Sequence, residues 1–141
     1  MSDDTLSMRT ISLAAAQRVL DAALAKATEM GKLFCICIAD PAGEPVLTAR
    51  MDGAPRLSAR IAADKAYTVA GFGGMPTSAW WGAIENEPSL VHGITKVPRL
   101  IVFGGGVGLF SGGELVGSIG VSGGSAEEDA VVATAGAGAL G

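Results

Sequence analysis

Residues that bind metals or form catalytic triads are scarce in this sequence. Its 141 residues include one histidine and two cysteines. A single histidine excludes metal sites built from several imidazoles of one chain, and nearly every intrachain Ser-His-Asp triad. The cysteines, Cys35 and Cys37, have no further soft ligand to complete a zinc site. They lie two positions apart on one face of a predicted strand, and we expect them to be buried free thiols.

Charge is also scarce, and long apolar runs are missing. Charged residues make up 17% of the chain, and the formal net charge is −4. The basic residues are scattered, which disfavours a nucleic-acid surface. No run approaches the roughly 18 apolar residues of a membrane span. Asp3 and Asp4 stand where a secretory signal would be basic. We therefore expect a cytoplasmic protein with no nucleic-acid or membrane partner.

Apolar residues, by contrast, are abundant for so short a chain. They make up 49% of a sequence that has the length of one domain. Apolar surface that a small core cannot hold is commonly buried between subunits. This surplus predicts a homo-oligomer. From its length and residue pattern, we expect a flexible tail at 1–10 and a single domain at 11–141.

Hydrophobic periodicity predicts helices and strands in the order α-β-β-α-α-β-β-β-α. The strand at 34–39 is apolar on both faces, which indicates a central strand covered by helices on two sides. Connections of hairpin length predict an antiparallel sheet. The expected fold is therefore α/β (α+β), with three α/β/α layers around five antiparallel strands. The expected helices are 13–30, 56–71, a short one from 76 and 126–137, and the expected strands are 34–39, 45–51, 100–103, 106–110 and 114–121.

A glycine-rich turn before the last helix has the pattern of a capping box. Ser125 can accept from the backbone N–H of Glu128, and the Glu128 carboxylate can reach back to Ser125. Helix N-termini of this kind also bind anions. Three acidic residues at 127–129 already occupy the positive end of the helix dipole, so a structural turn is the better interpretation.

Lys65 is the most unusual placement in the chain. On the predicted second helix it projects between Ile61 and Val69, in the middle of the apolar stripe. A lysine there can extend its ammonium to a rim, pair with a buried carboxylate or contact a ligand. Desolvation would also suit the amine to proton or Schiff-base chemistry. The sequence leaves these alternatives open.

Two further groups are candidates for binding. His92 can serve as a metal ligand or general base, or can be an ordinary surface residue. Asp52 and the arginines at 50 and 56 bracket the loop before the second helix. These basic groups can hold a carboxylate, or can pair with Asp52 instead. The adjacent tryptophans at 80 and 81 diverge by about 100° on a helix, so we expect one to lie at an interface or pocket mouth.

Five segments form a combination that is specific as a set and covers nearly the whole domain. They are IADPAGEPVL, RMDGA at 50–54, SARIAADKAYTVAGF, the glycines at 104–106, and GELVGSIGVSGGSAEEDAVVATAG. With these segments the chain resembles the GlcG/HbpS-like family, which includes the C-terminal domain of PduO-type proteins. The resemblance implies a profilin-like α/β/α fold, oligomers and, in some members, binding of haem or a related tetrapyrrole. The family positions carried over are Asp52, Lys65, Gly105, Gly106, Gly120, Ser122, Gly123 and Asp129.

One stretch departs from the family pattern. After the triple glycine the family usually has a proline between two small or apolar residues, whereas Val107-Gly108-Leu109 stands here. Losing the proline loosens the backbone where the resemblance places a pocket floor. The departure leaves the retention of haem binding open.

These observations lead to a binding hypothesis and to an alternative. In the first, a cytoplasmic oligomeric protein binds haem, another tetrapyrrole or an anionic cofactor. Its ligand-binding residues would be Arg56, Lys65, Thr77, Gly105, Gly106 and Ser122, with His92 or Thr77 near a haem iron. In the alternative, the chain is a catabolic isomerase, hydratase or lyase acting on a small organic acid, or an accessory subunit of such an enzyme. Lys65 would then be an electrostatic clamp for the substrate or a general base, with Asp52 or Asp129 as its partner.

Overall fold

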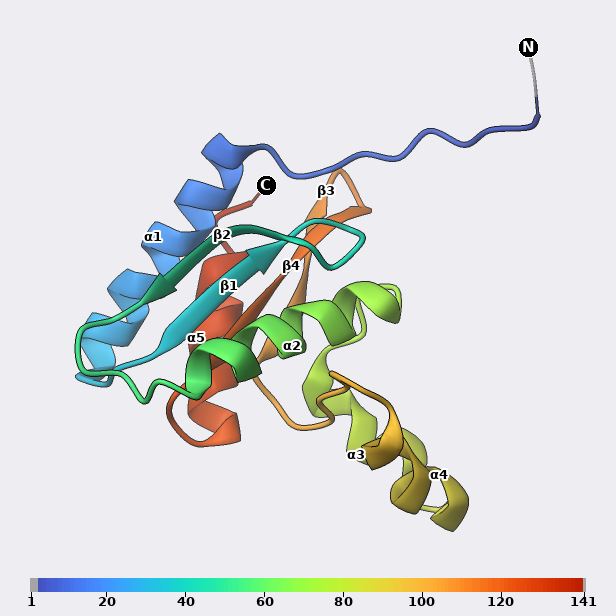
Figure 1. The fold of residues 1–141 in the computed structure, drawn as a ribbon. Coiled ribbons are helices and arrows are strands. Elements are labelled where there is room, and N and C mark those ends of the chain that lie inside the picture. Colours follow the sequence, from blue (N-terminus) through green and yellow to red (C-terminus); the bar gives the residue numbers. More distant parts are fainter. Residues whose placement is uncertain (1–2, 141) are drawn as a thin grey trace.

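A four-stranded antiparallel sheet lies at the centre of the protein, between two layers of helices (Figure 1). The computed structural model describes residues 3–140, so the ends of the predicted tail and domain, at 1–2 and 141, lie outside the described residues. The strand order is β2 (Pro45–Arg50), β1 (Cys35–Ala39), β4 (Glu114–Ser122) and β3 (Gly106–Ser111). Helices α1 (Leu13–Met30) and α5 (Ala126–Ala137) cover one face, and α2 (Ser58–Gly71) covers the other.

Strand β1 is interior, as its doubly apolar sequence predicted. It pairs with β2 on one side and β4 on the other, and all five of its residues are buried. Ile36 and Ile38 join the core beneath α1 and α5. Cys35 and Cys37 face α2 and are free thiols, which confirms that prediction. Burial raises the pKa of Cys37 to about 11.

The prediction of five strands was wrong, because residues 100–103 do not form a strand. Their polar backbone groups turn to a side chain of α2 instead. The Ile101 N–H donates to Thr68 Oγ1 at 3.0 Å, and the same hydroxyl lies 3.1 Å from the Arg99 carbonyl oxygen. Arg99 also has a left-handed backbone, with φ of 66°. The apolar run at 100–103 is therefore bonded to α2 and does not add a strand to the sheet.

Helices α1 and α5 begin at the capping residues that the sequence predicted, and α1 also ends at its predicted glycine. Ser12 accepts from the Ala15 N–H at the start of α1, and Gly31 ends that helix with φ of 68°. At α5, Ser125 and Glu128 form the predicted capping box in both directions. Helix α2 begins at Ser58, two residues later than predicted, because the preceding residues form a turn.

Short helical elements project from the end of α2 away from the sheet (Figure 1). This projecting segment, residues 77–96, contains η1 (Thr77–Ala79), α3 (Trp80–Ile84), α4 (Pro88–Gly93) and η2 (Ile94–Lys96). Trp80 is buried against Phe72, with ring centroids 4.7 Å apart, while Trp81 is 58% exposed. The adjacent tryptophans therefore diverge as expected. Within residues 3–140, every helix is too short or too polar to cross a membrane.

Candidate functional site

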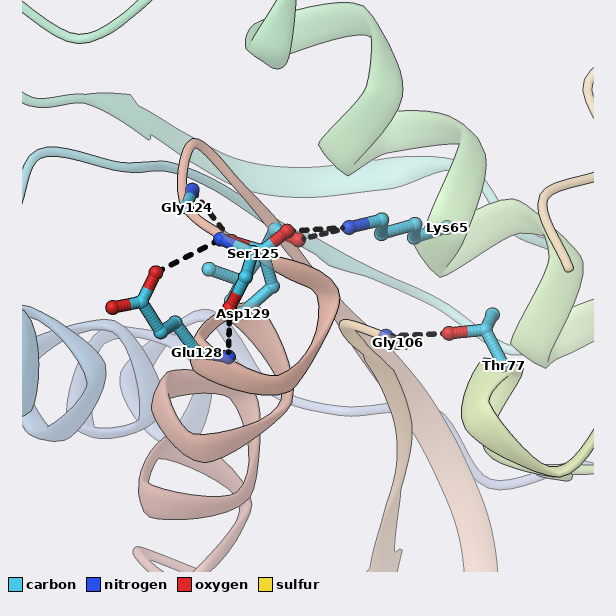
Figure 2. A network of polar contacts seen from close by, with 8 residues as sticks. Lys65, Thr77, Gly106, Gly124, Ser125, Glu128 and Asp129 are labelled. Carbon is cyan, nitrogen blue, oxygen red and sulfur yellow. Dashed lines mark hydrogen bonds and ion pairs between the residues drawn. The ribbon is translucent and has the colours of Figure 1, made fainter. Parts of the chain in front are cut away.

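The side chain of Lys65 ends in a buried polar cluster where α2, β4 and α5 meet (Figure 2). Its Nζ donates to the Val121 carbonyl oxygen at 2.8 Å and to Asp129 Oδ2 at 2.9 Å. The same nitrogen lies 5.0 Å from the centre of the Phe103 ring. An ammonium has three donors. A carbonyl oxygen, a carboxylate oxygen and one ring face therefore surround the amine.

Glycines make the room that this cluster needs. Gly105 has φ of 130°, and a Cβ there would lie 2.5 Å from Lys65 Nζ. The next residue, Gly106, donates its N–H to Thr77 Oγ1 at 2.9 Å, and a Cβ on Gly106 would lie 2.9 Å from Val69. The triple glycine at 104–106 thus brings its backbone directly against α2 and η1, because no side chain stands between them.

Asp129 is held from two sides in the first turn of α5. Its Oδ2 accepts from Lys65, and its Oδ1 accepts from the Gly124 N–H at 2.9 Å. Next to it, Glu128 accepts from the Ser125 N–H and pairs with Lys32 at 2.9 Å. Glu128 and Asp129 therefore bond to the turn that precedes α5, as Figure 2 shows.

Burial and hydrogen bonding act in opposite directions on the charges of the cluster. Burial lowers the pKa of Lys65 and raises the pKa of Asp129, and the hydrogen bond between the two groups opposes both shifts. The Ser125 N–H and the Lys32 ammonium lower the pKa of Glu128. Lys65 is 0% and Asp129 2% exposed. A charge buried this deeply is tolerated only with its partner, so the pair joins α2 to α5.

The structure brings together part of the predicted site and leaves the rest apart. Lys65, Thr77, Gly105 and Gly106 lie in or beside the cluster, together with Asp129. Ser122 is buried on β4, directly after the residue whose carbonyl accepts from Lys65.

The other predicted residues lie elsewhere on the surface. Arg56 is exposed ahead of α2, and His92 is exposed on α4. Asp52 is exposed in the loop after β2, and within residues 3–140 it forms no ion pair with Arg50 or Arg56. Of the two carboxylates considered as partners of Lys65, the structure places Asp129 beside the amine.

Two partners of Lys65 could not be found from the sequence. The Val121 acceptor is a backbone carbonyl, which no residue pattern identifies. Phe103 is 49% exposed and covers the amine from a loop that was expected to be a strand. The position of Phe103 directly before the triple glycine was the one sequence feature that could have placed this ring near Lys65.

The described residues contain no cluster of three or more His, Cys, Asp or Glu side chains that could hold a metal ion. His92 is the one imidazole in the sequence. It is exposed on α4, where its carbonyl accepts from Thr95 Oγ1 at 3.2 Å.

Comparison with known proteins points to one family. A family model described as haem degrading protein HbpS-like matches residues 11–138. An uncharacterized 15.0 kDa protein encoded in the dhaT-dhaS intergenic region of Citrobacter freundii is 36% identical over 126 residues, which cover 88% of this chain and 87% of that protein.

Solved structures with a similar fold point to the same family. The crystal structure of Klebsiella pneumoniae protein ORFY is similar with a TM-score of 0.90 and 30% identity, covering 99% of this chain and 96% of that one. The crystal structure of a PduOC:heme complex is similar with a TM-score of 0.83 and 26% identity, covering 93% and 95% of the two chains. The matched family model and these relatives show that the chain belongs to the HbpS-like family.

Proposed function

We propose that this chain is an oligomeric cytoplasmic protein that binds haem or a related tetrapyrrole, with the profilin-like arrangement of its family. The observation that carries the proposal is the placement of His92. The chain's one imidazole is exposed on α4 rather than buried in the core. A similar structure, the PduOC:heme complex, covers 93% of this chain. An accessible imidazole is the group from which a haem iron takes an axial ligand.

The surroundings of His92 fit a flat, largely apolar ligand with acidic groups. The projecting segment and the residue after it expose Trp81, Leu90 and Val97, of which Trp81 and Val97 are 58% and 48% exposed. Apolar surface of this kind favours a tetrapyrrole face. Lys96, four residues after His92, is exposed and has no ion-pair partner among residues 3–140. Its ammonium is suited to a propionate.

Lys65 and Thr77 have a different role in this proposal from the one their sequence positions suggested. The Lys65 amine is buried between Val121, Asp129 and Phe103. The Thr77 hydroxyl is 0% exposed and accepts from Gly106. Both side chains are buried and bonded within the protein, so the proposal places neither of them on the ligand. For the same reason the alternative of an enzyme with Lys65 as base has little support.

A second subunit is part of the proposal. Arg56 precedes α2, whereas His92 lies on α4 at the far end of the projecting segment (Figure 1). In the proposal, the two residues that meet one ligand come from different subunits. A site that uses both needs a neighbouring copy, and the exposed apolar side chains of the projecting segment supply surface for it.

Haem titration of the full chain tests the proposal by absorption spectroscopy. We expect saturable binding with a shifted Soret band, and loss of the low-spin spectrum in His92→Ala. Ser89→Ala, an exposed change on the same helix, is the matched control and should bind as the parent does. An unchanged spectrum in His92→Ala would remove this residue as ligand, and no uptake by the parent would overturn the proposed function. Light scattering that shows a monomer with and without haem would contradict the oligomer.

A further inference from the structure

A pocket of about 390 Å³ lies far from the projecting segment, at the opposite end of the sheet. It forms where residues 9–12 cross the end of the β3–β4 hairpin and enter α1. The Ile11 N–H donates to the Val116 carbonyl oxygen at 2.9 Å, which holds this crossing in place. Leu140, after α5, also lines the pocket, and Figure 1 shows the C-terminal end beside the first turns of α1.

Two arginines line this pocket, and neither has an acidic partner among the residues that the structure describes. Arg9 comes from the crossing segment, and its Nη1 lies 3.7 Å from where a Cβ on Gly112 would stand. Arg18 comes from α1, one turn after Ala15, which lines the same pocket. No carboxylate within residues 3–140 forms an ion pair with either guanidinium. Both guanidiniums are therefore available to an anionic ligand in the pocket.

The rest of the lining combines hydroxyl groups with apolar side chains. Thr10, Ser12 and Ser111 contribute the hydroxyls. The apolar part comes from Ile11, Ala15, Val116 and Leu140. Guanidinium groups bind planar oxyanions through paired hydrogen bonds, and carboxylates match that geometry. The apolar side chains give a short hydrocarbon part a place to be buried, and the volume lies in the range of small-molecule sites.

We propose that this pocket binds a small organic carboxylate, with its acid group between Arg9 and Arg18 and its apolar part against Ile11, Val116 and Leu140. The site shares no residue with the proposed tetrapyrrole surface, so the two proposals stand or fall separately. The N-terminal segment thereby acquires a binding role, through Arg9.

Calorimetric titration of the full chain with acetate, butyrate, hexanoate and inorganic phosphate tests the proposal. We expect saturable binding that strengthens along the carboxylate series, by about fourfold for each buried methylene. The double variant R9Q/R18Q should lose about ten- to a hundredfold in affinity for each of the two charge-assisted contacts that it removes. Both arginines are exposed, so the variant should keep the melting temperature of the parent.

The matched control is Arg60→Gln, which removes an exposed arginine from α2, outside the pocket. It should bind the carboxylates as the parent does. Absence of saturable carboxylate binding, or equal affinity in R9Q/R18Q and the parent, would overturn the proposal. Binding of phosphate with no gain along the carboxylate series would overturn the organic class of ligand. Haem titration of R9Q/R18Q should match the parent, which separates this site from His92.

Discussion

The two faces of the sheet are built from residues of different size. The face beneath α1 and α5 carries large aliphatic side chains, among them Ile36, Ile38, Ile119 and Val121. The face beneath α2 carries Cys35, Cys37, Ser118 and Gly120. On the first face side chains interlock, whereas on the second the helix backbone approaches the strand itself. A Cβ on Gly120 would collide with the Ala62 carbonyl oxygen.

This difference explains where the polar cluster could form. A helix that lies close to a strand lets a long side chain reach past the end of the sheet to the layer on the other side. Lys65 does so, and meets Asp129 of α5, which covers the opposite face. The small-residue face therefore contains the one ion pair that is buried at both partners among the described residues.

The largest effect is expected from Lys65→Met, which leaves the Asp129 carboxylate buried without its partner. We expect a loss of about 3–5 kcal/mol in the free energy of unfolding, measured by urea denaturation. Adding Asp129→Asn should recover part of this loss, because the amide carries no charge. Lys26→Met breaks an exposed pair with Glu29 and should cost at most about 0.5 kcal/mol. Equal losses in the two lysine variants would contradict a special role of the buried pair.

Adding one methyl group to the small-residue face should have the next largest effect. Gly120→Ala forces α2 away from β4, because the colliding atoms are backbone atoms of Ala62 and Ala66. We expect a loss of about 1–3 kcal/mol in stability. Ile119→Val, on the other face, removes a methylene and should cost about 0.5–1.5 kcal/mol. If Gly120→Ala cost less stability than Ile119→Val, the close approach of α2 to β4 would not restrict the size of side chains on this face.

A smaller loss of stability is expected from replacing Phe103, whose ring lies over the Lys65 amine. Phe103→Leu keeps an apolar side chain but removes the ring face that Lys65 Nζ meets at 5.0 Å. Because the ring is half exposed, the expected loss is about 0.5–1 kcal/mol. Phe103→Tyr keeps a ring and serves as the control. In the Lys65→Met background Phe103→Leu should cost less than in the parent, and an unchanged cost would argue against this contact.

The smallest effect concerns pH and the start of α5. The pKa of Glu128 is lowered in the folded protein, so its charged form stabilises the fold above the unfolded value of about 4.5, and this contribution is lost as pH falls through the folded pKa. Glu128→Gln should therefore make the loss of stability in acid shallower, measured by denaturation at a series of pH values. Glu127→Gln, an exposed neighbour in the same turn that takes no part in the capping box, serves as the comparison and should reduce stability at neutral pH less than Glu128→Gln does.

Much of the fold could be predicted because local signals agree with the packing. The caps at Ser12, Gly31 and Ser125 fix helix ends, and the doubly apolar β1 indicates a covered central strand. The segment at 100–103 failed because its apolar pattern fits a strand, while its backbone bonds depend on Thr68, which is distant in sequence.

The candidate site could be predicted only in part. The position of Lys65 in an apolar stripe indicated that its amine would be buried. Asp129 is distant in sequence, so the sequence could not show that it was the partner of this amine. Arg9 and Arg18 gave no signal, since one lies in a polar tail and the other on a polar helix face. Only the crossing of that tail over the hairpin brings them to one pocket.

The strand order also bears on how the chain folds. The two hairpins, β1–β2 and β3–β4, join residues that are close in sequence, whereas the central pairing of β1 with β4 joins Cys35 to Ser122. Closing so long a loop is entropically costly, so the halves of the sheet are expected to form before they join. Lys65 and Asp129 can meet only after that step. Their pairing then belongs to the late part of folding, and its removal should speed unfolding far more than it slows refolding.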